Sequence, residues 1–227
     1  MLSWELPYNE KPAAPPLTAH PLLNVTHSAT APPSRSALRN RLREQRRGLK
    51  PEQQRNAALR LDRIVGHSAL FRRSRHIAFF LANDGELDPQ PLMHRAWRMG
   101  KVCYLPVITP AKSLWFARYE HGDALTPNRF GIPEPACAGL PLLSARVLDL
   151  ILTPLVAFDD QGNRLGMGSG FYDRTLSFLR HRHVWRKPRL LGVAHELQHL
   201  AVLQAASWDV PLDGVATDED LYLFRNN

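Results

Sequence analysis

Short apolar runs alternate with helical segments along most of this chain. The runs at residues 76–82, 149–158 and 189–194 are apolar without interruption, as strands buried on both faces are. Amphipathic segments at residues 88–100 and 172–180 fall between or beside them and are expected to be helices. This alternation predicts an α/β domain in which an open, mostly parallel sheet is flanked by helices in three α/β/α layers.

The remaining elements are placed by the same patterns. Further strands are expected at residues 101–107, 113–119 and near 214–217 or 221–224. A helix is expected from Pro51 to about Gly66, with Leu59, Ile64 and Val65 facing inward.

The chain is expected to fold as one domain with an N-terminal arm. Its 227 residues suit one domain better than two. Residues 1–34 are rich in Pro, Ala and Thr without an apolar period, which predicts a disordered arm before a folded domain at residues 35–227. We see no secretory signal and no run near the ~20 apolar residues of a membrane helix. Cys103 and Cys137 form no CxxC pair. A cytoplasmic location without membrane contact is therefore expected.

A row of arginines marks the first helix of the folded domain, which Ser34 or Ser36 can cap. The arginines share one stripe: Arg35, Arg39, Arg43, Arg46 and Arg47. With the net charge of +8, the stripe leaves open a basic nucleic-acid-binding module over residues 35–47. No aromatic residues interleave with it and no RNA- or DNA-binding motif accompanies it, so a solvated helix face is favoured over a nucleic-acid site.

Three alternating glycines carry the strongest functional signal. Gly166, Gly168 and Gly170 follow a buried strand and a turn and precede a helix. The strip matches neither a Walker loop nor the GxGxxG fingerprint. Glycine backbone can approach an anion closely, the helix dipole favours negative charge, and Arg164 and Arg174 flank the strip. Phosphate binding is therefore predicted here.

A second motif points to a different chemistry. Residues His195, Glu196 and His199 fit HExxH, the zinc metallopeptidase pattern, which needs both histidines on one helix. The preceding residues 189–194 are expected to form a strand, so a helix can start only at about His195. A zinc peptidase is the weaker alternative, with His195 expected at a strand end and His199 at the surface.

The stretch FDDQGNRLGMGSGFYDRTL resembles the signature of the 5-formyltetrahydrofolate cyclo-ligase family. Other blocks resemble the same family in the expected order: the opening helix, FFLANDGELDPQPLMHRAWRMGKVCYLPV, FGIPEP, LDLILTPLVAFD, LLGVAHELQ and WDVPLDGVATD. The resemblance covers about residues 35–220. It implies ATP- and Mg²⁺-dependent closure of 5-formyltetrahydrofolate, with or without a polyglutamate tail, to 5,10-methenyltetrahydrofolate. The formyl oxygen would be phosphorylated, N10 would attack, and ADP and phosphate would leave. A monomer is expected.

The resemblance also implies roles for individual residues. Catalytic roles fall to Arg164, Tyr172 and Asp173. ATP contacts fall to Arg35, Arg39, Arg164, Gly166, Gly168, Gly170 and Tyr172. Folate contacts fall to Glu86, Gly168, Ser169, Gly170, Phe171 and Tyr172, with Glu86 on the pterin ring. The Mg²⁺ ligands would be Asp173 and Asp213. This chain has Arg35 where the family usually has lysine, and Phe171 where it has tyrosine.

Overall fold

The computed structural model describes residues 34–136, 141–181, 187–204, 206 and 208–224, and every structural statement below concerns these residues. They belong to one compact unit, Pro33–Asn227. Of the predicted arm, only Ser34 lies within the described residues, where its side chain caps helix α1 by accepting a hydrogen bond from the Ala37 amide at 3.2 Å.

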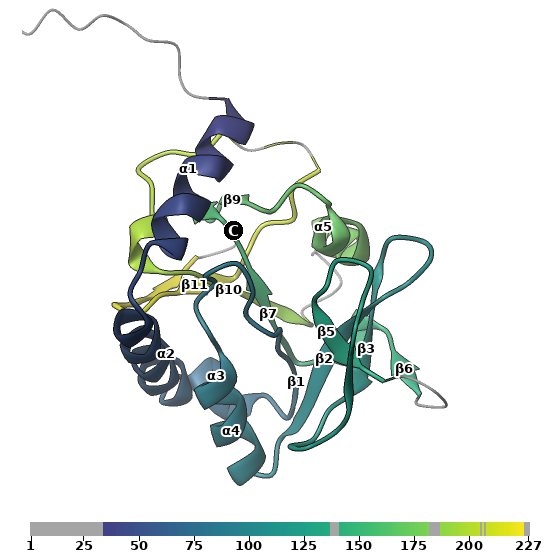
Figure 1. The fold of residues 1–227 in the computed structure, drawn as a ribbon. Coiled ribbons are helices and arrows are strands. Elements are labelled where there is room, and N and C mark those ends of the chain that lie inside the picture. Colours follow the sequence, from purple (N-terminus) through teal and green to yellow (C-terminus); the bar gives the residue numbers. More distant parts are fainter. Residues whose placement is uncertain (1–33, 137–140, 182–186, 205, 207, 225–227) are drawn as a thin grey trace, which may run out of the picture. The chain divides into compact units, whose positions relative to one another are not determined.

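A mixed sheet forms the centre of this unit (Figure 1). Its strands are β1 (His76–Ala78), β2 (Val102–Ile108), β3 (Leu114–Arg118), β6 (Leu142–Leu143), β7 (Leu150–Pro154), β10 (Arg189–Val193), β11 (Gly214–Ala216) and β12 (Leu221–Leu223). Their order is β12-β11-β10-β7-β1-β2-β3-β6. Neighbours from β11 to β2 are parallel, whereas β12, β3 and β6 pair antiparallel at the two edges.

Helices cover both faces of the sheet. They are α1 (Arg35–Arg47), α2 (Pro51–Gly66), α3 (Ala69–Arg73), α4 (Gln90–Arg98), α5 (Phe171–Thr175) and the 3-10 turns η1 (Ala145–Val147), η2 (Ser177–His181) and η3 (Glu196–Gln198). Leu150 and Leu152 of β7 pack with α2, α3 and α4, whereas Ile151 packs with the α5–η2 segment. Alternate residues of one strand thus enter different cores, as the uninterrupted apolar runs predicted, and the three-layer α/β fold is confirmed.

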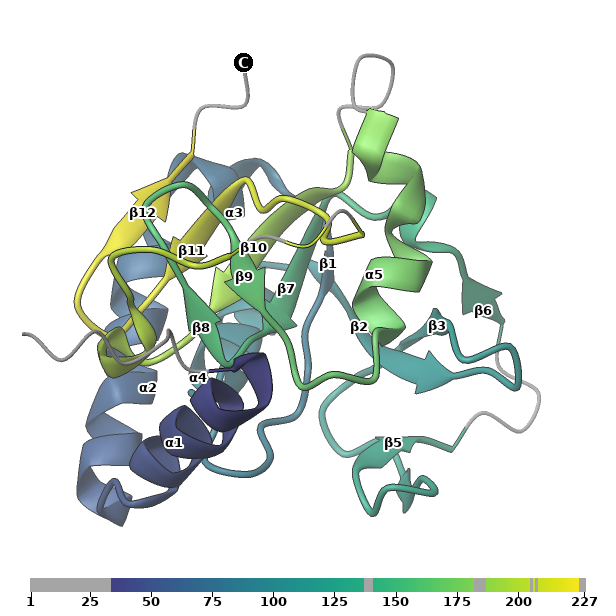
Figure 2. The ribbon, with the colours of Figure 1, turned by 90° about the horizontal axis from the view of Figure 1, so that it is seen from above.

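Two short hairpins and helix α1 lie outside the central sheet. The strands β4 (Leu125–Pro127) and β5 (Pro133–Pro135) form one hairpin, and β8 (Ala157–Phe158) and β9 (Arg164–Leu165) form the other. Leu42 of α1 packs against Ala157 and Leu165 of the β8–β9 hairpin, and Figure 2 shows this helix beside that hairpin. No described helix is both long and apolar enough to span a membrane.

Several boundaries differ from the predictions. The run at residues 149–158 breaks after Pro154 into β7 and β8, and β1 ends at Ala78 rather than at residue 82. The segment 172–180 is not one helix but α5 followed by η2. Leu59 was predicted to face inward and is 55% exposed, because the buried stripe of α2 runs through Leu61 and Val65 instead.

Candidate functional site

A pocket of about 670 Å³ lies at the carboxyl ends of the central strands. Open α/β sheets bind ligands at this edge because their loops converge there. Its walls come from α1, the turn after β1, the β4–β5 hairpin, the β9–α5 loop and the segment at residues 208–209. The structure brings together in it all but one of the predicted site residues: Arg35, Arg39, Glu86, Arg164, Gly166, Gly168, Ser169, Gly170, Phe171, Tyr172 and Asp173.

The glycine strip forms one wall of this pocket. Gly168 and Gly170 have φ values of +103° and +66°, which only glycine adopts without strain. The Gly166 carbonyl accepts a hydrogen bond from Arg39 Nε at 2.8 Å, so helix α1 anchors the strip. Helix α5 has only five residues. Its dipole is therefore small, and bare backbone and flanking arginines supply most of the positive potential that was predicted here.

Arg164 presents a buried cationic group beside the strip. Its side chain is 4% exposed, and its Nη2 donates to Asp173 Oδ1 at 2.5 Å. Its Nη1 is buried and has no hydrogen-bond partner among the described residues. A buried donor without a hydrogen-bond partner destabilises the fold unless a ligand accepts its hydrogen bond. This atom is therefore suited to donate to an anion in the pocket.

The β8–β9 hairpin holds Arg164 in place. The carboxylate of Asp159, fully buried, accepts hydrogen bonds from the Gln161 and Asn163 amides at 3.0 and 2.9 Å. It also accepts from the Leu203 amide at 2.8 Å. Asp159 thus stabilises the turn at residues 159–163 by binding backbone amides within it. Its bond to Leu203 also joins the hairpin to the segment that continues toward residue 209.

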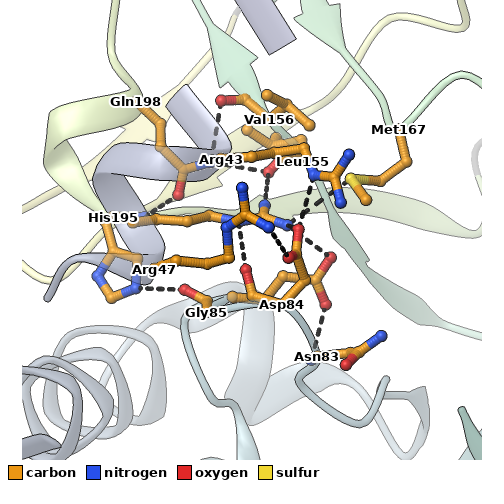
Figure 3. Close-up of polar contacts among 12 residues, drawn as sticks. Arg43, Arg47, Asn83, Asp84, Gly85, Leu155, Val156, Met167, His195 and Gln198 are labelled. Atoms are coloured by element: carbon orange, nitrogen blue, oxygen red, sulfur yellow. Dashed lines mark hydrogen bonds and ion pairs between the residues drawn. The ribbon is translucent and has the colours of Figure 1, made fainter. Parts of the chain in front are cut away.

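Glu86 lines the same pocket from the turn after β1. Burial raises its pKa to about 7, against the opposing charge of Arg46. Burial also works to raise the pKa of Asp84, but hydrogen bonds from Arg43 and Arg46 outweigh it and hold that pKa below its usual value. Figure 3 shows this turn and the arginines around it. The Tyr172 hydroxyl has a raised pKa through burial and through the charge of Glu86, so it is a neutral donor at ordinary pH.

The structure does not bring Asp213 into the pocket. Its carboxylate accepts from the Leu190 amide at 2.7 Å and pairs with Arg189 at 3.0 Å. Both partners lie at the start of β10, and the carboxyl ends of the strands form the opposite edge. The prediction that Asp173 and Asp213 share a metal site is therefore wrong in its geometry. Asp209, four residues earlier in the same motif, lines the pocket instead.

Sequence reasoning missed an apolar wall and an aromatic rim. The wall is formed by Phe80, Leu81, Ile108, Phe130, Ile132 and Pro133. Phe130 packs edge to face against Phe171 with ring centroids 5.8 Å apart. Trp208, which is 61% exposed, stands at the rim beside Asp209. The FGIPEP block contains Phe130, Ile132 and Pro133 and could have indicated the wall, but the family resemblance gave no role to any of its residues.

The HExxH residues do not form a zinc site. The buried His195 donates from Nε2 to the Gly85 carbonyl at 3.2 Å, and burial lowers its pKa. His199 Nε2 lies 2.8 Å from the exposed Asp160, and one face of its ring stacks on Phe158, so it lies half-buried near the surface. The described residues contain no cluster of His, Cys, Asp or Glu that could hold a metal ion by itself.

The arginine stripe is engaged largely within the molecule, although Arg47 keeps 53% of its side chain exposed. Arg35 pairs with Asp209 at 3.2 Å, and Arg39 bonds to the glycine strip. The other three surround Asp84: Arg43 at 2.7 Å, Arg46 at 3.0 Å and Arg47 at 3.4 Å. Because most of these charges are engaged within the molecule, a solvated face describes only part of the stripe, such as Arg47. The arrangement gives no support to a nucleic-acid module.

Fold and pocket together define an α/β protein whose sheet edge carries arginines, bare glycine backbone and several carboxyl groups. The model of the 5-formyltetrahydrofolate cyclo-ligase family matches residues 31–218. The chain belongs to this family, as its motifs predicted.

Individual relatives are similar to this chain over nearly their whole lengths. The 5-formyltetrahydrofolate cyclo-ligase of Escherichia coli K12 is 41% identical over 80% of this chain and 98% of its own. That of Haemophilus influenzae is 36% identical over 78% of this chain and 94% of its own. The solved structure of Aquifex aeolicus 5,10-methenyltetrahydrofolate synthetase superposes with a TM-score of 0.73 at 28% identity, covering 85% of this chain and 94% of that one.

Proposed function

We propose that this chain closes 5-formyltetrahydrofolate to 5,10-methenyltetrahydrofolate with ATP and Mg²⁺. Membership of the 5-formyltetrahydrofolate cyclo-ligase family supports the cyclo-ligase activity. A formamide oxygen is a poor leaving group until it is phosphorylated. In the proposed sequence this oxygen attacks the γ-phosphorus and ADP leaves. N10 then attacks the activated carbon and loses its proton, and the carbon–oxygen bond breaks to release phosphate.

The arginine and glycine wall supports an ATP site. Three donors converge there: the bare backbone of the strip, Arg39 and the unpaired Nη1 of Arg164. Phosphoryl transfer needs positioning and neutralisation of phosphate charge more than a protein nucleophile, and this wall offers both. The observation that carries the proposal is the buried, unpaired Nη1 of Arg164 in the same pocket as the Glu86 carboxyl group, whose pKa is raised by burial.

Glu86 and the apolar wall of the pocket support a folate site. A pterin presents paired N–H donors on its pyrimidine edge, and one carboxylate can accept both. Glu86 is the buried acid suited to this role, and the apolar wall that includes Ile108 and Phe130 can pack on the ring system. We place Tyr172 between the two ligands, where its neutral hydroxyl can donate to the oxygen that receives the phosphoryl group.

Asp173 and Asp209 fit a magnesium ion that is held jointly with phosphate. Mg²⁺ is commonly bound by one or two carboxylates together with substrate phosphates. Both side chains line the pocket, and Asp173 lies next to the Asp209 segment because its Oδ1 accepts from the Val210 amide at 3.5 Å. The chemistry that the ion supplies is neutralisation of phosphate charge. Asp173 and Asp209 would also have to exchange their present arginine partners for it.

Product formation tests the proposal directly. Purified protein is mixed with 5-formyltetrahydrofolate, ATP and Mg²⁺, and the absorbance of the methenyl product is followed. We expect product only when both ATP and Mg²⁺ are present, with one ADP for each product. Turnover that continues without ATP would contradict the proposal, as would peptide cleavage that a zinc chelator abolishes. We expect the enzyme to act as a cytoplasmic monomer and to accept polyglutamylated substrate.

A further inference from the structure

Arg46 is a fully buried arginine that does not line the pocket. Its side chain is 0% exposed, which is tolerated only when the charge is paired and its donors are used. Nε donates to the Asp84 carbonyl at 2.9 Å, and Nη2 donates to the Asp84 carboxylate at 3.0 Å. Nη1 lies 3.3 Å from the Leu155 carbonyl at the end of β7. The guanidinium therefore joins α1, the turn after β1 and the central sheet. Two of the residues that it contacts, Asp84 and Leu155, are labelled in Figure 3.

The turn that Arg46 holds has an unusual backbone. Asp84 and Gly85 have φ values of +54° and +74°, and Asp84 is not a glycine. A Cβ on Gly85 would lie 3.0 Å from the Arg46 carbonyl oxygen, so the turn rests directly on α1. The Gly85 carbonyl also accepts from His195 Nε2 on the other side. This conformation persists because several side chains bind it at once.

The next residue in the turn is Glu86. Its Oε1 lies 3.6 Å from Arg46 Nη2, and its Oε2 accepts from the Asn83 amide at 3.2 Å. The same Nη2 lies 3.6 Å from the sulfur of Met167, which is also in the pocket wall. Arg46 thus lies directly behind two residues that line the pocket, without reaching the ligand space itself.

We propose that Arg46 is a positioning residue: it clamps the Asp84–Gly85 turn and thereby fixes the Glu86 carboxyl group for folate. This inference rests on the proposed function. The charged and titratable groups that face Glu86 are Arg43 and Arg46 from α1, Asp84 from its own turn and Tyr172 from α5. Removing Arg46 should misplace the carboxyl group and also remove a positive charge that favours its ionised form.

The test compares three variants with the wild type: Arg46→Gln, Arg46→Lys and, as a control, Arg47→Gln. Arg47 also contacts Asp84, but its side chain is 53% exposed. Folded samples, checked by circular dichroism, are titrated separately with 5-formyltetrahydrofolate and with ATP across a pH series. For Arg46→Gln we expect about tenfold weaker folate binding. Its ATP affinity should stay within about threefold of the wild type.

The pH series separates positioning from a merely structural effect. The midpoint of folate binding should move up by about one unit in Arg46→Gln, because an adjacent positive charge is lost. Arg46→Lys should keep the wild-type midpoint and recover part of the affinity, and Arg47→Gln should match the wild type. If Arg46→Gln does not fold, Asp84→Asn tests the same clamp, with weaker folate binding and a midpoint that moves down.

Two results would overturn the inference. One is equal loss of ATP and folate binding in Arg46→Gln, and the other is a pH midpoint that stays unchanged in both Arg46→Gln and Asp84→Asn. If the wild type itself bound no folate, the proposed function would fail instead. The two failures are therefore distinguishable.

Discussion

Glu86 is the residue whose protonation should set the pH dependence of folate binding. Its pKa is raised to about 7, so the carboxylate forms as the pH rises through 7. Only the carboxylate accepts both pterin donors, so the folate affinity should rise across this range and then level off. Glu86→Gln should remove that dependence and weaken folate binding by about 1–3 kcal/mol, leaving ATP binding unchanged. Calorimetry at several pH values decides this, and a flat wild-type profile would refute it.

Two residues of the proposed ATP site should fail in different ways. Gly168 has a φ of +103°, which a β-branched residue cannot adopt without strain, so Gly168→Val should abolish ATP binding. Arg164→Ala leaves the loop shape intact and removes one charged donor, so ATP binding should weaken by about 1.5–3 kcal/mol. Both affinities are measured by calorimetry on folded protein. Normal ATP affinity in Gly168→Val would remove the loop from the nucleotide site.

The choice between Asp209 and Asp213 marks the limit of prediction at the residue scale. Both stand in WDVPLD, and no pattern in the sequence tells which carboxylate faces the pocket. The fold decides, because Asp213 precedes β11 at the amino edge and its carboxylate binds the Leu190 amide. By contrast, the glycines at 166, 168 and 170 were found from sequence because their bare backbone is itself the functional feature.

At the scale of elements, β10 carries a glycine that close packing requires. A Cβ on Gly192 would lie 2.6 Å from Leu155 and 2.8 Å from Leu212. Gly192→Ala should therefore overpack this core and lower the free energy of unfolding by about 1–3 kcal/mol. Urea unfolding followed by circular dichroism measures it. Gly48→Ala is the matched control, since Gly48 has a helical φ of −73° at the end of α1, and it should change stability by less than about 0.5 kcal/mol. Equal stability of the two variants would contradict the packing argument.

Elements with long, regular patterns were predictable, and elements fixed by tertiary contacts were not. The Ser34 cap and the arginine stripe indicated α1, and the apolar run beginning at residue 149 indicated β7. The β4–β5 hairpin escaped prediction because its strands are short and contain prolines, which is weak evidence for a strand. The pairing of Arg43 and Arg46 with Asp84 was not predicted either, since Asp84 is distant in sequence and a charged stripe usually faces solvent.

At the scale of the whole molecule, the layers followed from sequence but the pocket walls did not. Uninterrupted apolar strands require cover on both faces, which dictates helices on both sides of the sheet. The pocket instead depends on which loops meet at one edge of the sheet. Only the family resemblance placed Glu86 beside the glycine strip, because more than 70 residues separate them along the chain.

Because the pocket is assembled from many segments that are far apart in sequence, ligands should bind only the folded chain and stabilise it as a whole. ATP with Mg²⁺ at about 100 times its Kd should add about 2.7 kcal/mol to the free energy of unfolding. For a domain of this size the Tm should rise by about 5–11 °C in a thermal melt. Chelating the Mg²⁺ with EDTA should shrink the rise, and so should Asp173→Asn, since each weakens the jointly held ion. Asp213 lies away from the pocket, so Asp213→Asn should lower the Tm of the free protein but keep the increase in Tm that ATP and Mg²⁺ cause. If that increase were lost in Asp213→Asn and kept in Asp173→Asn, Asp213 rather than Asp173 would be the metal ligand.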